Sequence, residues 1–143
     1  MKRLTSAVIV VGLIALHSCT IGTEPGAQRG LGLVIEGEPP MTSLIAPSTV
    51  QAGAPFQVTA STFGSSTCTK PDGYQLDVLA GRVAVRLYDL TAPPQTICTD
   101  DLRGFARVLI LRFDIPGTSQ VAVIGRGWDG KTREILQAVT VVP

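Results

Sequence analysis

Histidine and tryptophan are almost missing from this chain of 143 residues, which holds one of each. The histidine is His17, in an N-terminal segment that we expect to be removed from the mature protein. Without it the protein has no imidazole, which excludes Ser-His-Asp and Cys-His catalysis and any histidine-ligated metal. No other catalytic group stands out. We therefore expect a protein that is not an enzyme and that holds no cofactor or metal.

An excess of charge of one sign is missing as well. Twelve Lys and Arg stand against eleven Asp and Glu, and the two signs are interspersed along the chain. A nucleic-acid surface requires a basic patch or stripe, so we expect no nucleic-acid partner. Lysine is scarce, whereas valine, threonine, glycine and proline are plentiful. This balance favours strands and turns over helices and predicts an all-β fold.

The N-terminus has the parts of an export signal. Lys2 and Arg3 are basic, and residues 7–16 form an apolar run of ten residues. A membrane-spanning helix needs about 20 apolar residues, so this run is too short to be one.

The segment that follows, Leu16-His17-Ser18-Cys19, resembles the lipobox of bacterial lipoproteins. An aliphatic residue stands three positions before the cysteine, and a small residue stands directly before it. The resemblance implies that residues 1–18 are a signal peptide and that Cys19 carries lipid. It also implies anchoring in the cell envelope, outside the cytoplasm. Thr20 stands where an aspartate often retains such proteins at the inner membrane, which favours the outer membrane in a Gram-negative cell.

If Cys19 carries lipid, two cysteines remain, Cys68 and Cys98. In an oxidising compartment, two leftover cysteines in one small domain usually pair. The sequence therefore predicts a Cys68–Cys98 disulfide. A metal site is the poorer alternative, because two thiols without a histidine fall short of the usual four ligands.

Glycine and proline are dense in residues 19–42, which predicts a flexible tether after the lipidated cysteine, with a short strand at 31–35 as an option. From residue 43 onward, apolar segments alternate with turn residues every 8 to 12 positions, as in an antiparallel sandwich or barrel. We expect seven strands, at about 43–50, 56–63, 74–79, 82–90, 106–115, 120–126 and 132–142. The third strand should turn Tyr74, Leu76 and Val78 inward. The fourth should turn Val83, Val85 and Leu87 inward, and the sixth should turn Val121 and Val123 inward. On the fifth strand the expected inward residues are Leu109, Leu111, Phe113 and Ile115.

Two of these segments resemble the immunoglobulin-like modules of bacterial surface proteins. Residues 46–59, APSTVQAGAPFQVT, look like the start of such a module, and residues 113–123, FDIPGTSQVAV, look like its fifth-to-sixth strand corner. The resemblance implies a single immunoglobulin-like β-sandwich over residues 43–143. The chain departs from antibody domains because Cys68 and Cys98 are only 30 positions apart with no tryptophan between them.

Alternating strand directions would gather the loops that hold Cys68, Cys98 and Trp128 at one pole, where a disulfide is geometrically possible. Trp128 is then either a binding anchor or a cover over the end of the core. The candidate binding residues at this pole are Trp128, Asp129, Tyr74, Asp100 and Asp101.

Two other motifs have simpler explanations. Residues 125–130 match the G-x-G-x-x-G nucleotide pattern, but no further βαβ unit exists and a hairpin turn at Asp129-Gly130 explains the glycines. Asp100 and Asp101 could coordinate calcium with Asp72 or Asp129, or could form a polar turn.

The sequence therefore favours a non-enzymatic, lipid-anchored module of the cell envelope that binds or supports an envelope protein or glycan. One alternative is an envelope glycoside hydrolase that uses two carboxylates about 5 to 9.5 Å apart in a groove. Another is a calcium-stabilised adhesion module.

Overall fold

The computed structural model describes residues 25–143, so the expected signal peptide and Cys19 lie outside the described residues. Within this range the chain is all-β, as predicted, and no helix there is long and apolar enough to span a membrane. Its strands are β1 (Gln28–Leu31), β2 (Leu44–Ile45), β3 (Thr49–Gln51), β4 (Pro55–Ser66), β5 (Thr69–Leu79), β6 (Arg82–Thr91), β7 (Asp100–Arg112), β8 (Gly117–Arg126) and β9 (Thr132–Val142).

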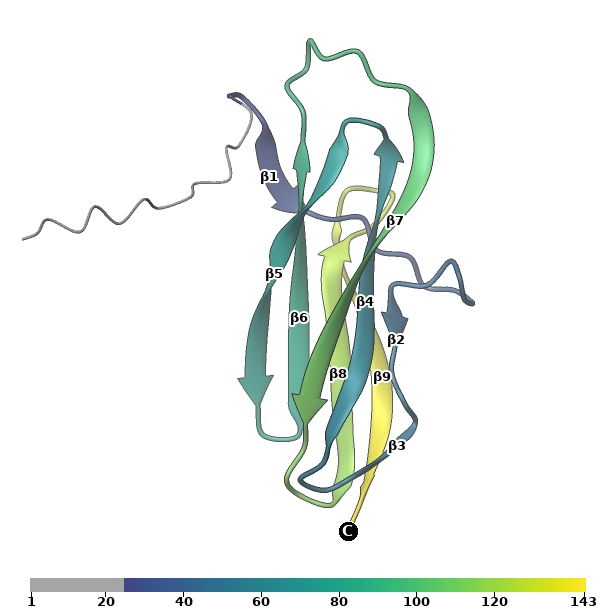
Figure 1. Cartoon of the computed structure of the whole chain (residues 1–143), viewed down its shortest axis with the longest axis vertical. Helices are drawn as coiled ribbons and strands as arrows, with labels where there is room; N and C mark the ends of the chain where they lie inside the picture. The colour runs from purple at the N-terminus through teal and green to yellow at the C-terminus, as the bar shows by residue number, and fades with distance from the viewer. Residues whose placement is uncertain (1–24) are drawn as a thin grey trace, which may run out of the picture.

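The strands form two sheets (Figure 1). The larger sheet has the order β1-β6-β8-β9-β3, with β5 on the other edge of β6, and the smaller sheet has the order β2-β4-β7. β8 pairs with the first half of β6 and β1 with its second half, so β1 and β8 share one edge of that strand. The β6–β8 and β3–β9 pairs are parallel, and the other pairs are antiparallel.

The hydrophobic core lies between the two sheets because alternate side chains of each strand point inward. The smaller sheet contributes buried residues from β4 and β7, and the larger sheet contributes them from β6, β8 and β9. The inward residues expected for the fourth and sixth strands are all buried: Val83, Val85, Leu87, Val121 and Val123. Strand alternation alone therefore predicted this part of the core correctly.

β5 follows the expected third strand, but its inward face is uncovered. Tyr74, Leu76 and Val78 are exposed, so the prediction that they enter the core is wrong. The three strands of the smaller sheet end at β7, and β5 is an edge strand of the larger sheet that lies beyond β7 (Figure 1). Ile115 is exposed too, because β7 ends at Arg112 and Ile115 falls in the following turn.

The prediction of a tether is wrong for its described part, because the fold begins well before residue 43. β1 pairs with β6, and the buried Leu33 bridges to Phe63 of β4 and to Arg126 of β8. Leu33 therefore joins the two sheets. Gly32 passes so close to the interior that an added Cβ would lie 2.5 Å from Asp89 Oδ2. The glycine at position 32 is therefore required by close packing and does not indicate a flexible linker.

The expected strand at 43–50 is split in two, because the chain changes sheets there. β2 pairs with β4 in the smaller sheet, and β3 pairs with β9 in the larger one. This split, together with β1, makes nine strands over residues 25–143 instead of seven. The loops expected at 64–73 and 91–105 are also shorter than predicted, since β4, β5 and β7 extend into them.

Candidate functional site

Three connections lie at one end of the molecule, the pole. They are the β4–β5 turn at Thr67 and Cys68, the β6–β7 loop over residues 92–99, and the β8–β9 turn over residues 127–131. β1 also begins at this end (Figure 1). Strand alternation predicted this gathering of Cys68, Cys98 and Trp128.

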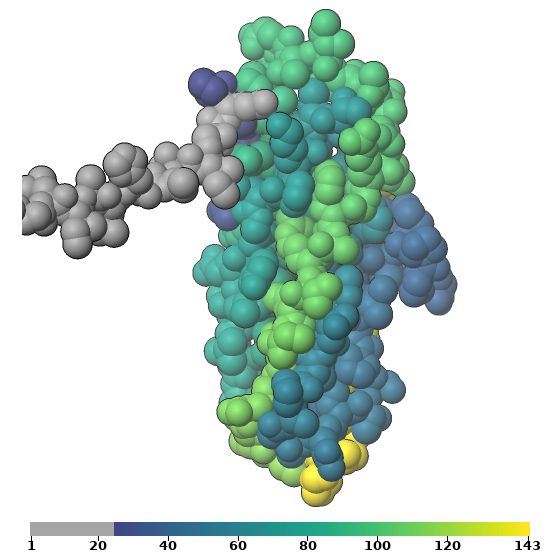
Figure 2. All heavy atoms as spheres, viewed as in Figure 1, coloured from purple at the N-terminus to yellow at the C-terminus, as the bar shows by residue number. Residues whose placement is uncertain are grey.

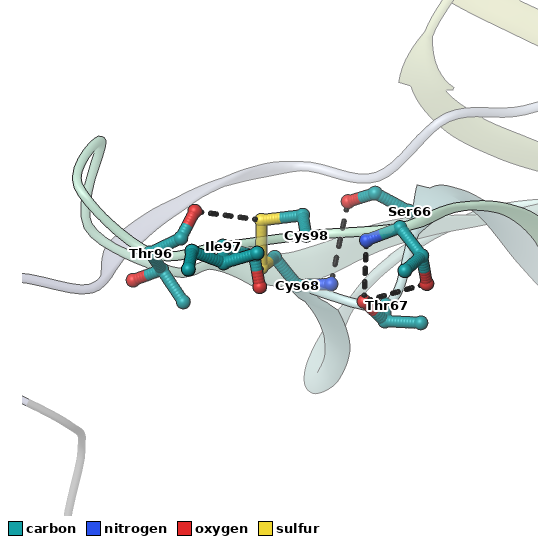
Figure 3. The surroundings of a disulfide bond; sticks show 7 residues. Ser66, Thr67, Cys68, Thr96, Ile97 and Cys98 are labelled. Carbon is teal, nitrogen blue, oxygen red and sulfur yellow. Dashed lines mark hydrogen bonds between the residues drawn. A yellow bond between two sulfur atoms is a disulfide. The ribbon is translucent and has the colours of Figure 1, made fainter.

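The predicted disulfide fastens two of these connections together. Cys68 and Cys98 are joined through their sulfur atoms (Figure 3), with their Cα atoms 5.5 Å apart. Beside the bond, the Thr67 N–H donates to the Thr99 carbonyl oxygen at 3.0 Å, and the Thr99 N–H donates to Thr67 Oγ1 at 3.1 Å. The 92–99 loop is therefore held to the β4–β5 turn by one covalent bond and by hydrogen bonds in both directions.

A hollow of about 400 Å³ lies beside the β8–β9 turn, and we call it the Trp128 hollow. Its lining residues are Val34, Ile35, Glu36, Gly127, Trp128, Asp129, Arg133, Glu134 and Ile135. Trp128 is 65% exposed, so its indole does not fold back over the core. The aliphatic side chains in the lining and this indole together offer a ligand an apolar surface.

Carboxylates outnumber basic groups around this hollow. Asp129 accepts a hydrogen bond from the Lys131 backbone N–H at 3.2 Å and pairs with Arg133 at 3.0 Å. The hydrogen bond from the Lys131 backbone N–H is the largest effect on the pKa of Asp129 and lowers it. Desolvation opposes this effect, and the charge and hydrogen bond of Arg133 lower the pKa further. Glu134 pairs with Arg82. Glu36 makes no hydrogen bond or ion pair within residues 25–143, so one carboxylate of the lining is left for a ligand.

The sequence anticipated only part of this site. Trp128 and Asp129 line the hollow, whereas Tyr74, Asp100 and Asp101 do not. Tyr74 lies on β5, and Asp100 and Asp101 begin β7. The sequence reasoning missed Val34, Ile35 and Glu36 because it placed them in the tether. The apolar run from Leu31 to Ile35 was the available signal that this segment packs.

A second polar group lies in the interior and was not predicted. Arg107 of β7 reaches between the sheets and donates to Asp89 Oδ1 of β6 at 2.9 Å and to the Tyr88 carbonyl oxygen at 2.8 Å. Thr62 Oγ1 of β4 donates to the same Asp89 oxygen at 2.8 Å. The other oxygen, Asp89 Oδ2, is buried and has no hydrogen-bond partner among residues 25–143. Burial raises the pKa of Asp89, and the hydrogen bonds from Thr62 and Arg107 oppose this rise.

Three of the four carboxylates considered for calcium are engaged by arginines. Asp72 pairs with Arg29, Asp101 with Arg103, and Asp129 with Arg133. Among residues 25–143, no group of three or more His, Cys, Asp or Glu side chains is arranged to hold a metal ion. The carboxylates considered for calcium therefore do not form such a cluster among the described residues.

The G-x-G-x-x-G match belongs to a hairpin. β8 and β9 pair antiparallel on either side of it, and no helix follows within the described range. A Cβ on Gly125 would lie 2.5 Å from the Gly32 carbonyl oxygen, so this glycine allows the N-terminal segment to pass closely. Gly130 has φ of +75°, as the turn requires.

No protein family, curated protein or solved structure matches this chain.

Proposed function

We propose that the protein is a non-enzymatic binding module of the bacterial cell envelope, anchored by lipid on Cys19, that captures its partner at the Trp128 hollow. The observation that carries the binding role is the exposed indole beside a hollow of about 400 Å³. Aromatic side chains in such positions supply large contact area at low entropy cost. The export signal and the lipobox-like segment ending at Cys19 support the location.

The fold that presents this hollow is, in our proposal, an immunoglobulin-like β-sandwich. Two sheets that enclose one apolar core, with strands joined mostly by short turns, support that architecture. Loops at the ends of a rigid β scaffold are common carriers of recognition. The disulfide at the pole adds rigidity and so reduces the entropy lost when a partner binds.

The electrostatics of the hollow favour binding over glycoside hydrolysis. A hydrolytic acid must hold a proton near neutral pH, which requires a raised pKa. The pKa of Asp129 is lowered instead, and Glu134 is committed to Arg82. The carboxyl group with a raised pKa, Asp89, belongs to the interior pair with Arg107.

The lining also indicates the chemistry of the partner. Three carboxylates and one guanidinium line the hollow. Of these three carboxylates, Glu36 is the one that makes no hydrogen bond or ion pair with residues 25–143. A lysine or arginine side chain of the partner could place its charged group near Glu36 and its apolar stem against the indole. The charged group could also lie over the indole ring in a cation–π contact. We therefore propose an envelope protein that presents a basic segment as the partner, ahead of a glycan.

The single tryptophan allows a direct test, because all tryptophan fluorescence comes from this hollow. We expect a hexalysine peptide to change Trp128 emission. The variant Glu36→Gln should weaken that response by up to about fivefold, because Glu36 is exposed and an exposed charged contact is worth at most about 1 kcal/mol. Glu38→Gln, an exposed change outside the lining, is the matched control and should behave as wild type.

A response to an N-acetylglucosamine tetramer without any response to hexalysine would contradict the basic partner and assign the hollow to a glycan. Silence toward both probes would contradict the binding role. The anchor is tested separately: Cys19→Ala should abolish incorporation of a labelled fatty acid, and unchanged labelling would refute lipidation at Cys19.

A further inference from the structure

The 92–99 loop forms the tip of the molecule at the pole (Figure 2). No Asp, Glu, Lys or Arg occurs from residue 90 to residue 99. Near the end of the loop, Ile97 is 96% exposed, and the disulfide at Cys98 fixes the next residue. An almost fully exposed isoleucine on an uncharged and covalently braced loop is suited to an apolar partner.

The first described residues lie beside this loop. A Cβ on Gly26 would be 3.3 Å from Pro93 Cγ, so the chain enters the fold directly against the loop. Seven peptide steps separate Cys19 from Gly26. A fully extended chain of that length spans at most about 25 Å. A lipid on Cys19 would therefore keep Gly26, which lies against the loop at Pro93, within that distance of the membrane surface.

We propose that the 92–99 loop rests on the lipid bilayer, with Ile97 inserted among the headgroups and upper acyl chains. This inference rests on the lipidation of Cys19 proposed above. The loop brings no charge that would lose its hydration on contact. One isoleucine binds membranes weakly on its own, but it adds a second contact to an attached lipid, and two signals give more stable anchoring than one.

This contact sets the orientation of the fold. The pole faces the membrane, and the β5–β6 and β7–β8 turns at the other end point away from it (Figure 1). The β8–β9 turn lies further back from the tip than the 92–99 loop in the same view (Figure 1). The Trp128 hollow is thus held close to the membrane without being pressed against it.

Fluorescence quenching by brominated lipid tests the contact. The lipidated protein is reconstituted into phosphatidylcholine vesicles with brominated acyl chains. One variant combines Trp128→Phe with Ile97→Trp. The control combines Trp128→Phe with Ile115→Trp, which places the reporter in the exposed β7–β8 turn at the far end. Both replaced isoleucines are exposed, so both variants should melt alike.

We expect emission from the Ile97→Trp variant to fall about twofold or more in brominated vesicles, as for a side chain at the acyl boundary. Emission from the Ile115→Trp variant should not change. Equal quenching, or none in either variant, would overturn the proposal. Flotation separates this failure from failure of the anchor. Protein that floats with vesicles but shows no quenching at position 97 refutes the loop contact alone, whereas protein that does not float refutes both.

Discussion

Two aspartate–arginine pairs of almost equal length lie in opposite surroundings. Asp89 and Arg107 approach to 2.9 Å, with side chains only 5% and 11% exposed. Asp129 and Arg133 approach to 3.0 Å, with side chains 38% and 60% exposed. The pKa of Asp89 is raised by burial, whereas that of Asp129 is lowered by the Lys131 N–H and by Arg133. Burial rather than distance therefore decides what each pair does.

The interior pair links a strand of the larger sheet to a strand of the smaller one. Both charges have left water, so each depends on the other and on Thr62. The exposed pair lies in solvent at the rim of the Trp128 hollow, where water screens its attraction. The first pair should matter strongly for folding, and the second should matter mainly for the shape and charge of the hollow.

The largest expected effect comes from breaking the interior pair. Arg107→Leu leaves Asp89 buried without a counter-charge and should lower the free energy of unfolding by about 3 to 5 kcal/mol. Arg133→Leu, the same change in the exposed pair, should cost less than about 1 kcal/mol. Urea unfolding at neutral pH measures both.

A double variant that removes both interior charges tests the same prediction more sharply. The double variant Asp89→Leu, Arg107→Leu removes both charges and should regain a large part of the stability lost in Arg107→Leu. Similar losses for Arg107→Leu and Arg133→Leu would show that the two pairs do not differ as their burial implies.

Removal of the disulfide is expected to have the next largest effect. The bond closes a loop with a sequence separation of 30. Cys68→Ala with Cys98→Ala should therefore lower stability by about 3.5 kcal/mol in the chain-entropy model and lower the melting temperature by several degrees. Protein from the envelope should weigh two hydrogens less than its reduced form. Two titratable thiols in that protein would contradict the prediction.

The dependence of stability on pH should have opposite signs at the two aspartates. The folded protein holds the Asp89 proton more tightly than the unfolded chain does. The stability due to Asp89 is therefore fully present below the unfolded pKa and declines as pH rises from about 4 through the folded pKa. Asp129 contributes stability above about pH 4 that is lost as pH falls through its lowered pKa.

Urea titrations of wild type against Asp89→Asn and against Asp129→Asn, across pH 3 to 8, measure these two slopes. Each variant removes one titrating carboxyl group. The wild-type advantage over Asp89→Asn should shrink as pH rises, and the advantage over Asp129→Asn should shrink as pH falls. Slopes of the same sign would contradict the contrast between the two sites.

The smallest change in stability is expected at the exposed site itself. Because Trp128 is mostly exposed, Trp128→Ala should change the free energy of unfolding by no more than about 0.5 kcal/mol. It should weaken hexalysine binding, measured by calorimetry, by about 1 kcal/mol or more. A large loss of stability with unchanged binding would assign Trp128 to structural support.

The sequence by itself determined the features that depend on local pattern or on counting. Alternation of apolar residues correctly predicted the buried faces of β6 and β8, because side chains on successive strand residues point to opposite sides. The Cys68–Cys98 pairing followed from the number of cysteines left after Cys19 is set aside. The common pole for Cys68, Cys98 and Trp128 followed from alternating strand directions.

Tertiary structure alone decided which faces are covered. Leu76 on β5 and Val85 on β6 are register partners, yet only Val85 is buried, because the smaller sheet ends before it reaches β5. The passage of Leu33 between the sheets and the meeting of Asp89 with Arg107 bring together residues far apart in the chain. No local pattern specifies such partners, because burial and ion pairing depend on which strands the fold places opposite one another.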